Sequence, residues 1–135
     1  MSGRILIIED EVLIAWQLRD VLEDLNYTVV GMAGNAPAAR LLVEDGRVDL
    51  ALVDIHLSDG PTGVDLGREI GQGSGITVLY LTSNPEMVRN GVPGTFGVMS
   101  KPTDDDCVRT AVAFAMQSRR GGASTVAPRS LTVFH

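Results

Sequence analysis

The chain has 135 residues, the length of one common globular domain, and its 44% hydrophobic content excludes an intrinsically disordered protein. A formal net charge of −6 argues against a nucleic-acid binder, whose affinity rests on Lys and Arg contacts to phosphates, and the apolar runs are far too short to cross a bilayer. We therefore expect no DNA or membrane partner. The single cysteine, Cys107, excludes an internal disulfide, and the first predicted strand begins too early for a signal peptide to precede it. Both features predict a cytoplasmic protein.

Short apolar runs rich in Val, Ile and Leu predict parallel strands that are covered on both faces. These runs cover residues 4–8, 28–32, 50–53, 76–81 and 95–99. Each run is followed by a segment with helical features, and strands that alternate with helices indicate βαβ units with right-handed crossovers. The sequence therefore predicts one α/β domain with a parallel sheet over residues 1–120.

The predicted helices differ in strength. The first begins near Val12 and stops near Asn26, the second has Asn35 as its N-cap, and the third covers about 64–70. The fourth, over about 84–91, is short and lies among glycines and prolines, which break helices. The last is the clearest, because a possible cap at Thr103 precedes three aspartates and a regular apolar stripe. The segment 121–135 lacks sustained periodicity and is expected to be a flexible tail.

Acidic residues stand directly after two of the predicted strands. Glu9, Asp10 and Glu11 follow residues 4–8, and Asp54 follows residues 50–53. Because the carboxyl ends of the strands line one crevice in an open α/β sheet, we expect these side chains to converge. Oxygen ligands without a His or Cys cluster suit Mg²⁺. We interpret Glu11 as a helix N-terminal charge and the other acids as a candidate Mg²⁺ site.

Asp54 interrupts an apolar stretch, ahead of the turn at residues 58–61. Nucleophilic attack on phosphorus, assisted by a metal ion, would explain a carboxylate in that position. Lys101, stopped by Pro102, ends another predicted strand and can serve as a point charge for a phosphate oxygen or for Asp54. Thr82 offers a hydroxyl at the same edge. Together these residues predict a site that neutralises, orients and senses one phosphoryl group.

The motifs Glu9-Asp10, Val53-Asp54, Tyr80-Leu81-Thr82 and Lys101-Pro102 resemble, in order and spacing, those of the receiver domains of bacterial two-component response regulators. The resemblance covers about residues 3–118. Within it, the stretches 7–11 and 57–65 are similar to receivers of alphaproteobacterial stress-signalling systems. It implies a flavodoxin-like, doubly wound (βα)5 fold of three layers. The sheet would have five parallel strands in the order 2-1-3-4-5.

The resemblance also implies a role for each residue of the site. Asp54 would be the phosphoacceptor, and a histidine kinase or phosphotransfer protein would be the donor. Mg²⁺ would be bound by Asp10, Asp54 and the backbone carbonyl of His56, with Glu9 acting through water. Thr82 would bind a phosphoryl oxygen, and Lys101 would pair with the phosphate and precede a cis peptide bond.

Three further positions are expected to modulate the response. His56 and Asn84, two residues beyond the nucleophile and the hydroxyl, should flank the path of the hydrolytic water. Val98 occupies a position where receivers usually carry Tyr or Phe. Phe96, two positions earlier, would lie on the same side by strand alternation. Switching is therefore expected to depend on the loop after Thr82.

Two other classes of function are compatible with an α/β fold of this kind. An aspartyl-nucleophile phosphohydrolase would resemble the haloacid-dehalogenase phosphatases, but the segment Asp54-Ile55-His56 lacks their second acid. A flavodoxin-like cofactor binder would need a glycine-rich phosphate loop after the first strand, which this sequence does not have. We therefore predict a signalling module that catalyses only its own phosphorylation and dephosphorylation.

The last predicted helix carries a second apolar stripe through Cys107 and Phe114, and a band that wide implies a further cover. The cover would be a symmetric partner helix, a kinase or target protein, or the chain's own tail through its apolar residues near 131–134. We favour the first two. The predicted docking face is formed by the 84–91 helix, the 95–99 strand and the last helix.

Overall fold

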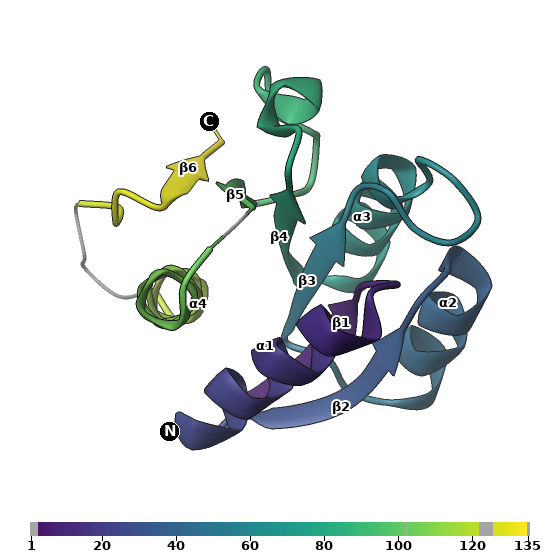
Figure 1. The fold of residues 1–135 in the computed structure, drawn as a ribbon, viewed down its shortest axis with the longest axis horizontal. Helices are drawn as coiled ribbons and strands as arrows, with labels where there is room; N and C mark the ends of the chain where they lie inside the picture. Colours follow the sequence, from purple (N-terminus) through teal and green to yellow (C-terminus); the bar gives the residue numbers. More distant parts are fainter. Residues whose placement is uncertain (1–2, 102, 122–125, 135) are drawn as a thin grey trace.

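A six-stranded sheet forms the centre of the molecule, in the order β2-β1-β3-β4-β5-β6 (Figure 1). The computed structural model describes residues 3–101, 103–121 and 126–134. The strands are β1 (Arg4–Ile8), β2 (Thr28–Ala33), β3 (Leu50–Asp54), β4 (Thr77–Thr82), β5 (Gly97–Ser100) and β6 (Leu131–Val133). The first five pair in parallel, so the predicted doubly wound sheet and its order are confirmed for them.

The predicted number of five strands is too small, because β6 adds a sixth strand antiparallel to β5. This strand comes from the segment that we expected to be a flexible tail. Its three residues are too few to produce a periodic pattern, and it forms because the free edge of β5 supplies backbone partners. Residues 131–133 are thus a strand, while the domain boundary at residue 120 stays a prediction.

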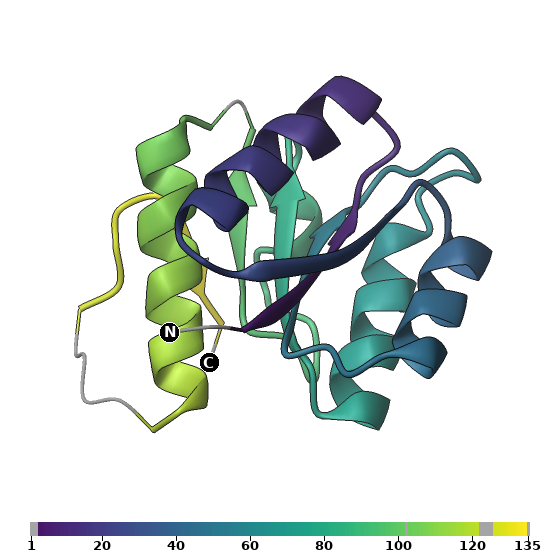
Figure 2. The same cartoon turned by 90° about the horizontal axis from the view of Figure 1, so that it is seen from below.

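Helices cover both faces of the sheet. The helices α1 (Val12–Asp24) and α4 (Asp105–Arg119) lie on one face, and α2 (Ala36–Asp45) and α3 (Gly63–Ser74) lie on the other (Figure 2). Each pair encloses its own apolar layer against the sheet. The predicted three-layer arrangement is confirmed. None of the helices among the described residues is long and apolar enough to cross a membrane.

The predicted helix over residues 84–91 is wrong. Only a single 3-10 turn, η1 (Pro85–Val88), forms between β4 and β5, so the (βα)5 pattern lacks one helix. Gly91 and Gly94 follow with φ angles of 85° and 83°, in the left-handed region that glycine adopts most readily. The chain therefore turns back into β5 before a second helical turn can form.

The helix caps depend on local hydrogen bonds. The Asn35 side chain accepts a hydrogen bond of 2.9 Å from the Ala38 amide, which confirms the predicted N-cap of α2. At α4 the predicted cap Thr103 is wrong, because the Asp104 side chain accepts the hydrogen bond of 2.8 Å from the Cys107 amide. Asp104 has the extended backbone of an N-cap, and its carboxylate reaches the Cys107 amide, which has no partner within the helix.

The two residues that we expected on one side of β5 lie in different layers. Val98 is buried among the residues beneath α2 and α3. Phe96 packs on the opposite layer, where its ring centroid lies 6.0 Å from that of Phe114 on α4. Phe96 precedes the first residue of β5, so the alternation of the strand does not extend to it. It cannot replace an aromatic side chain at position 98.

Candidate functional site

The predicted site residues meet at the carboxyl end of the parallel strands. Asp54 and Thr82 are the last residues of β3 and β4, and Glu9 and Lys101 directly follow β1 and β5. The register of the sheet aligns these ends; for example, Asp54 pairs with Leu81. The convergence predicted from the strand ends is confirmed.

Lys101 lies between two buried carboxylates. Its Nζ donates hydrogen bonds to Glu9 Oε1 at 2.6 Å and to Asp54 Oδ2 at 3.1 Å. The side chains of Glu9 and Asp54 are only 2% and 9% exposed, so water screens these ion pairs weakly. The lysine therefore joins two residues that are 45 positions apart in the sequence (54 − 9) and holds them at one point.

The charges of this group depend on one another. Burial raises the pKa of Glu9 to about 7, and the nearby Asp54 adds to the rise, while the Lys101 hydrogen bond opposes it. Burial alone would lower the pKa of Lys101, but its hydrogen bonds to Glu9 and Asp54 outweigh that effect and raise the pKa. Lys101 thus keeps its positive charge at neutral pH, whereas the Glu9 carboxyl group titrates near that pH.

Three carboxylates gather at this point, and one ammonium group faces them. Glu9, Asp10 and Asp54 each offer an oxygen atom, and these atoms lie within 4.8 Å of one another. Asp10 is exposed and borders a hollow of about 410 Å³ that leads to Asp54. A cluster of hard oxygen donors with excess negative charge at an open hollow fits a divalent cation such as Mg²⁺. The direct ligand role of the His56 carbonyl stays a prediction, and its amide donates to Asp54 Oδ1 at 3.3 Å.

Thr82 is fully buried beside the acidic cluster. Its Oγ1 accepts a hydrogen bond of 3.0 Å from the Asn84 amide, and its carbonyl accepts one of 2.8 Å from the Lys101 amide. Thr82 is not among the residues that line the hollow, so its role toward a phosphoryl oxygen stays a prediction. The side chains of Asn84 and His56 are both exposed, but only His56 lines the hollow. The predicted cis bond of Lys101 involves residue 102, which lies outside the described residues.

Sequence reasoning missed two contributors. Ser83 lines the hollow, and its position directly after Thr82 was the available signal. Gly63, at the start of α3, lies so close to β3 that a side chain there would overlap the Asp54 carbonyl oxygen. Its amide also donates to the Ile55 carbonyl at 2.9 Å. Gly63 thus allows α3 to support the chain that carries Asp54.

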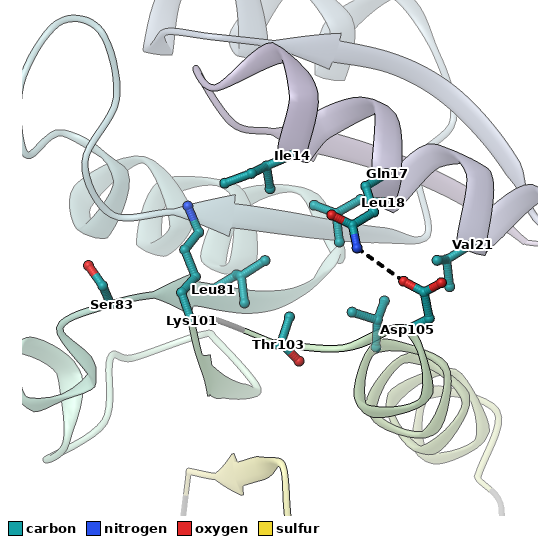
Figure 3. A pocket seen from close by; sticks show the side chains of 10 residues that line it. Ile14, Gln17, Leu18, Val21, Leu81, Ser83, Lys101, Thr103 and Asp105 are labelled. Atoms are coloured by element: carbon teal, nitrogen blue, oxygen red, sulfur yellow. Dashed lines mark hydrogen bonds between the residues drawn. The ribbon is translucent and has the colours of Figure 1, made fainter.

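A second hollow, of about 270 Å³, adjoins the site between α1 and α4 (Figure 3). Ten residues surround it, from α1, from the ends of β4 and β5 and from the start of α4, and five of them are apolar. The hydrogen bond of 3.2 Å from Gln17 to Asp105 connects the two helices across it. Lys101 lines both hollows, so its methylene groups lie against apolar neighbours while its ammonium group reaches the acids.

Comparison with known families identifies one that covers most of the chain. The family profile described as "Response regulator receiver domain" matches residues 5–113. The chain is also 33% identical over 118 residues to the phyllosphere-induced regulator PhyR of Methylorubrum extorquens, covering 86% of this chain and 44% of that protein. The chain therefore spans less than half the length of this curated relative.

Solved structures with the same fold include two response regulators. The crystal structure of PhyR from Brucella abortus aligns with a TM-score of 0.81 and 31% identity, covering 90% of this chain and 50% of that one. The solution structure of the Erythrobacter litoralis PhyR receiver domain aligns with a TM-score of 0.78 and 30% identity, covering 94% of this chain and 97% of that one.

Proposed function

The chain belongs to the response regulator receiver domain family, and we propose that it accepts a phosphoryl group on Asp54 and passes the signal on through protein–protein contacts. The observation that carries the proposal is the position of Lys101 between Glu9 and Asp54, with Asp10 completing a cluster of three carboxylates. The donor is proposed to be a histidine kinase or phosphotransfer protein in the cytoplasm.

In the proposed reaction a carboxylate oxygen of Asp54 forms a bond to phosphorus while the bond from phosphorus to the donor's imidazole nitrogen breaks. The electron pair of that bond stays on the nitrogen, and the product is an acyl phosphate on Asp54. Lys101 already contacts Asp54 Oδ2 and is placed to neutralise a phosphoryl oxygen. The Thr82 hydroxyl would donate a hydrogen bond to a second phosphoryl oxygen.

The acidic cluster would hold Mg²⁺ through Glu9, Asp10 and Asp54, with the His56 carbonyl as a further ligand. When bound, the cation would reduce the repulsion between the Asp54 carboxylate and the incoming phosphoryl group. Asp10 is the one exposed member of the cluster and lies at the hollow, so it is the side chain best placed to admit a hydrated cation.

His56 and Asn84 are proposed to set the lifetime of the acyl phosphate. His56 lines the hollow, where it would limit the approach of water to phosphorus, and Asn84 is tied through its amide to Thr82. The role of Val98 would be indirect, because its side chain is buried in the apolar layer between the sheet and the helices α2 and α3. The alternative of a phosphohydrolase with Asp54 as its nucleophile is less well supported, since no second acid stands two residues beyond Asp54.

Acetyl phosphate with Mg²⁺ tests the proposal, with intact-mass spectrometry as the readout. We expect one adduct on the unmodified chain, none on Asp54→Asn, and none in EDTA. Glu11→Gln is the matched control, because Glu11 lines the same hollow but lies outside the carboxylate cluster, and it should be labelled normally. Labelling of Asp54→Asn, or continuous hydrolysis of an external phosphate ester, would contradict the assignment.

A further inference from the structure

The C-terminal strap, which we define as residues 129–134, occupies the free edge of β5. Val98 pairs with Thr132 in an antiparallel register, and the Phe134 amide donates to the Phe96 carbonyl at 2.9 Å. Because hydrogen-bonded pairs alternate along an antiparallel ladder, Thr132 and Val98 form the next hydrogen-bonded pair. These hydrogen bonds use backbone groups that any extended segment can offer.

The strap contacts both apolar layers. Leu131 is 5% exposed and joins the layer under α1 and α4, where Val133 packs as well. Phe134 joins the opposite layer, and its ring centroid lies 6.5 Å from that of Tyr80. Phe134 thus lies on the side of β5 where the expected 84–91 helix did not form, next to Gly91.

Gly97 permits this close approach. A Cβ atom at Gly97 would lie 2.5 Å from the Thr132 carbonyl oxygen and 3.1 Å from a Leu131 methyl group. No L side chain fits there without moving the strap. The edge of β5 is therefore shaped to admit a strand at short distance, and that property belongs to β5 and not to the strap itself.

Hollows flank the strap on both sides. One, of about 290 Å³, lies between the strap and the start of α4 and is lined by Asp104, Cys107 and Arg129. The other, of about 280 Å³, lies between Phe134 and the loop before β5. Only three residues of the strap pair with the sheet, and hollows lie on either side of it, so we expect the strap to open locally more readily than the central strands.

We propose that the β5 edge is a docking surface for an extended segment of a partner protein, and that the C-terminal strap is an intramolecular competitor for that surface. Addition of a strand to a free sheet edge is a common mode of peptide recognition. The strap defines the chemistry of the partner segment: a basic residue facing the acidic start of α4, then apolar residues at the Leu131 and Val133 positions and an aromatic residue at the Phe134 position.

In this competition the tethered strap has the advantage over a free segment. A segment tethered to the same chain acts at an effective concentration of the order of mM, so a free peptide of equal contacts is excluded while the strap is seated. A partner gains access either through additional contacts to α4 or when the strap opens. The proposal does not depend on phosphorylation of Asp54.

Hydrogen exchange on the unmodified protein tests the opening. The Phe134 amide should exchange at least ~100-fold faster, after correction for intrinsic rates, than the Leu52 amide in the central strand β3. Equal protection of these two amides would overturn the proposal, because it would make the strap an integral part of the cooperative core.

Peptide binding tests the surface. Thr132→Pro in the full chain removes the donor of the Thr132–Val98 pair, and Thr132→Val is the matched control, since the Thr132 side chain is exposed. The probe is a synthetic peptide of residues 126–134, followed through the amide NMR signals of β5. We expect the peptide to bind Thr132→Pro at least ~10-fold more tightly than the unmodified chain or Thr132→Val.

Two outcomes would refute the docking surface. The first is that a folded Thr132→Pro protein fails to bind the peptide, even when the peptide concentration is several times the ~mM effective concentration of the tethered strap. The second is equal binding to Thr132→Pro and to its variant carrying Gly97→Ala, whose Cβ should exclude any strand from this edge. A peptide with Arg129→Glu should bind more weakly, and unchanged binding would contradict the proposed basic position.

Discussion

Glu9→Gln should remove most of the pH dependence of stability of the metal-free protein between pH 5 and pH 8. The Glu9 side chain is buried, and folding transfers its carboxyl group away from water. Burial is the main reason that its pKa stands at about 7 in the folded chain, against an ordinary value of 4.5. Glutamine has nearly the same shape and can accept the hydrogen bond from Lys101, but its side chain does not titrate between pH 5 and pH 8.

The sign and the size of the effect follow from that difference. Because the folded state holds the Glu9 proton more tightly than the unfolded state, this group favours folding below pH 4.5, and its contribution is lost as the pH rises to about 7. A difference of this size corresponds to about 3 kcal/mol. Lys101 keeps its charge throughout this range, since its pKa is raised. The carboxyls with lowered pKa, such as Asp104, act below this range.

Urea unfolding in EDTA at pH 5 and pH 8 measures the effect. We expect the unmodified protein to lose roughly 2 to 3 kcal/mol more than Glu9→Gln on going from pH 5 to pH 8, since at pH 5 the carboxyl group is already partly ionised in the unfolded state. Glu11→Gln is the control, because Glu11 is exposed, and it should behave like the unmodified protein. An equal loss of unfolding free energy between pH 5 and pH 8 in Glu9→Gln and in the unmodified protein would refute the reasoning. It would mean that the hydrogen bond from Lys101 offsets the effect of burial on the pKa of Glu9.

Three further predictions concern the same site. Lys101→Met leaves two buried carboxylates without their cation, so the free energy of unfolding at pH 8 should fall by roughly 3 kcal/mol and recover in part at pH 5.5, as measured by urea unfolding. Mg²⁺ binding competes with the Glu9 proton, so the affinity measured by calorimetry should rise by up to about tenfold per pH unit below pH 7 and level off above it. Replacing His56 or Asn84 by Ala should change the decay rate of the Asp54 adduct, followed by intact mass, without changing Mg²⁺ affinity.

Each of these predictions has an outcome that contradicts it. A Lys101→Met protein as stable as the original at pH 8 would show that Glu9 and Asp54 do not need their cation. A Mg²⁺ affinity that is flat between pH 5.5 and pH 8 would separate Glu9 from the metal site. Decay rates unchanged by both Ala variants would place the path of the hydrolytic water elsewhere.

The sequence by itself determined the central sheet and the residues of the site. Strong apolar runs specify buried strands wherever they occur, and in a parallel sheet all strand ends of one kind meet at one edge. Glu9, Asp54 and Lys101 therefore had to converge once the strands were identified, although they are far apart in the chain. The three-layer arrangement of the helices followed from the same alternation of strands and helices.

Tertiary contacts decided the short and irregular parts. The three residues of β6 are too few to give a periodic pattern, and they form a strand because they pair with the β5 edge and because Leu131 and Val133 pack against the layer under α1 and α4. The segment over residues 84–91 had helical features, but Gly91 and Gly94 adopt left-handed conformations and end it after η1. Phe96 lies in the layer of Phe114, because the alternation of side chains holds only within a strand. The intrinsic preference of a residue for helix or strand contributes little free energy, so over so few residues the packing of neighbouring segments outweighs it.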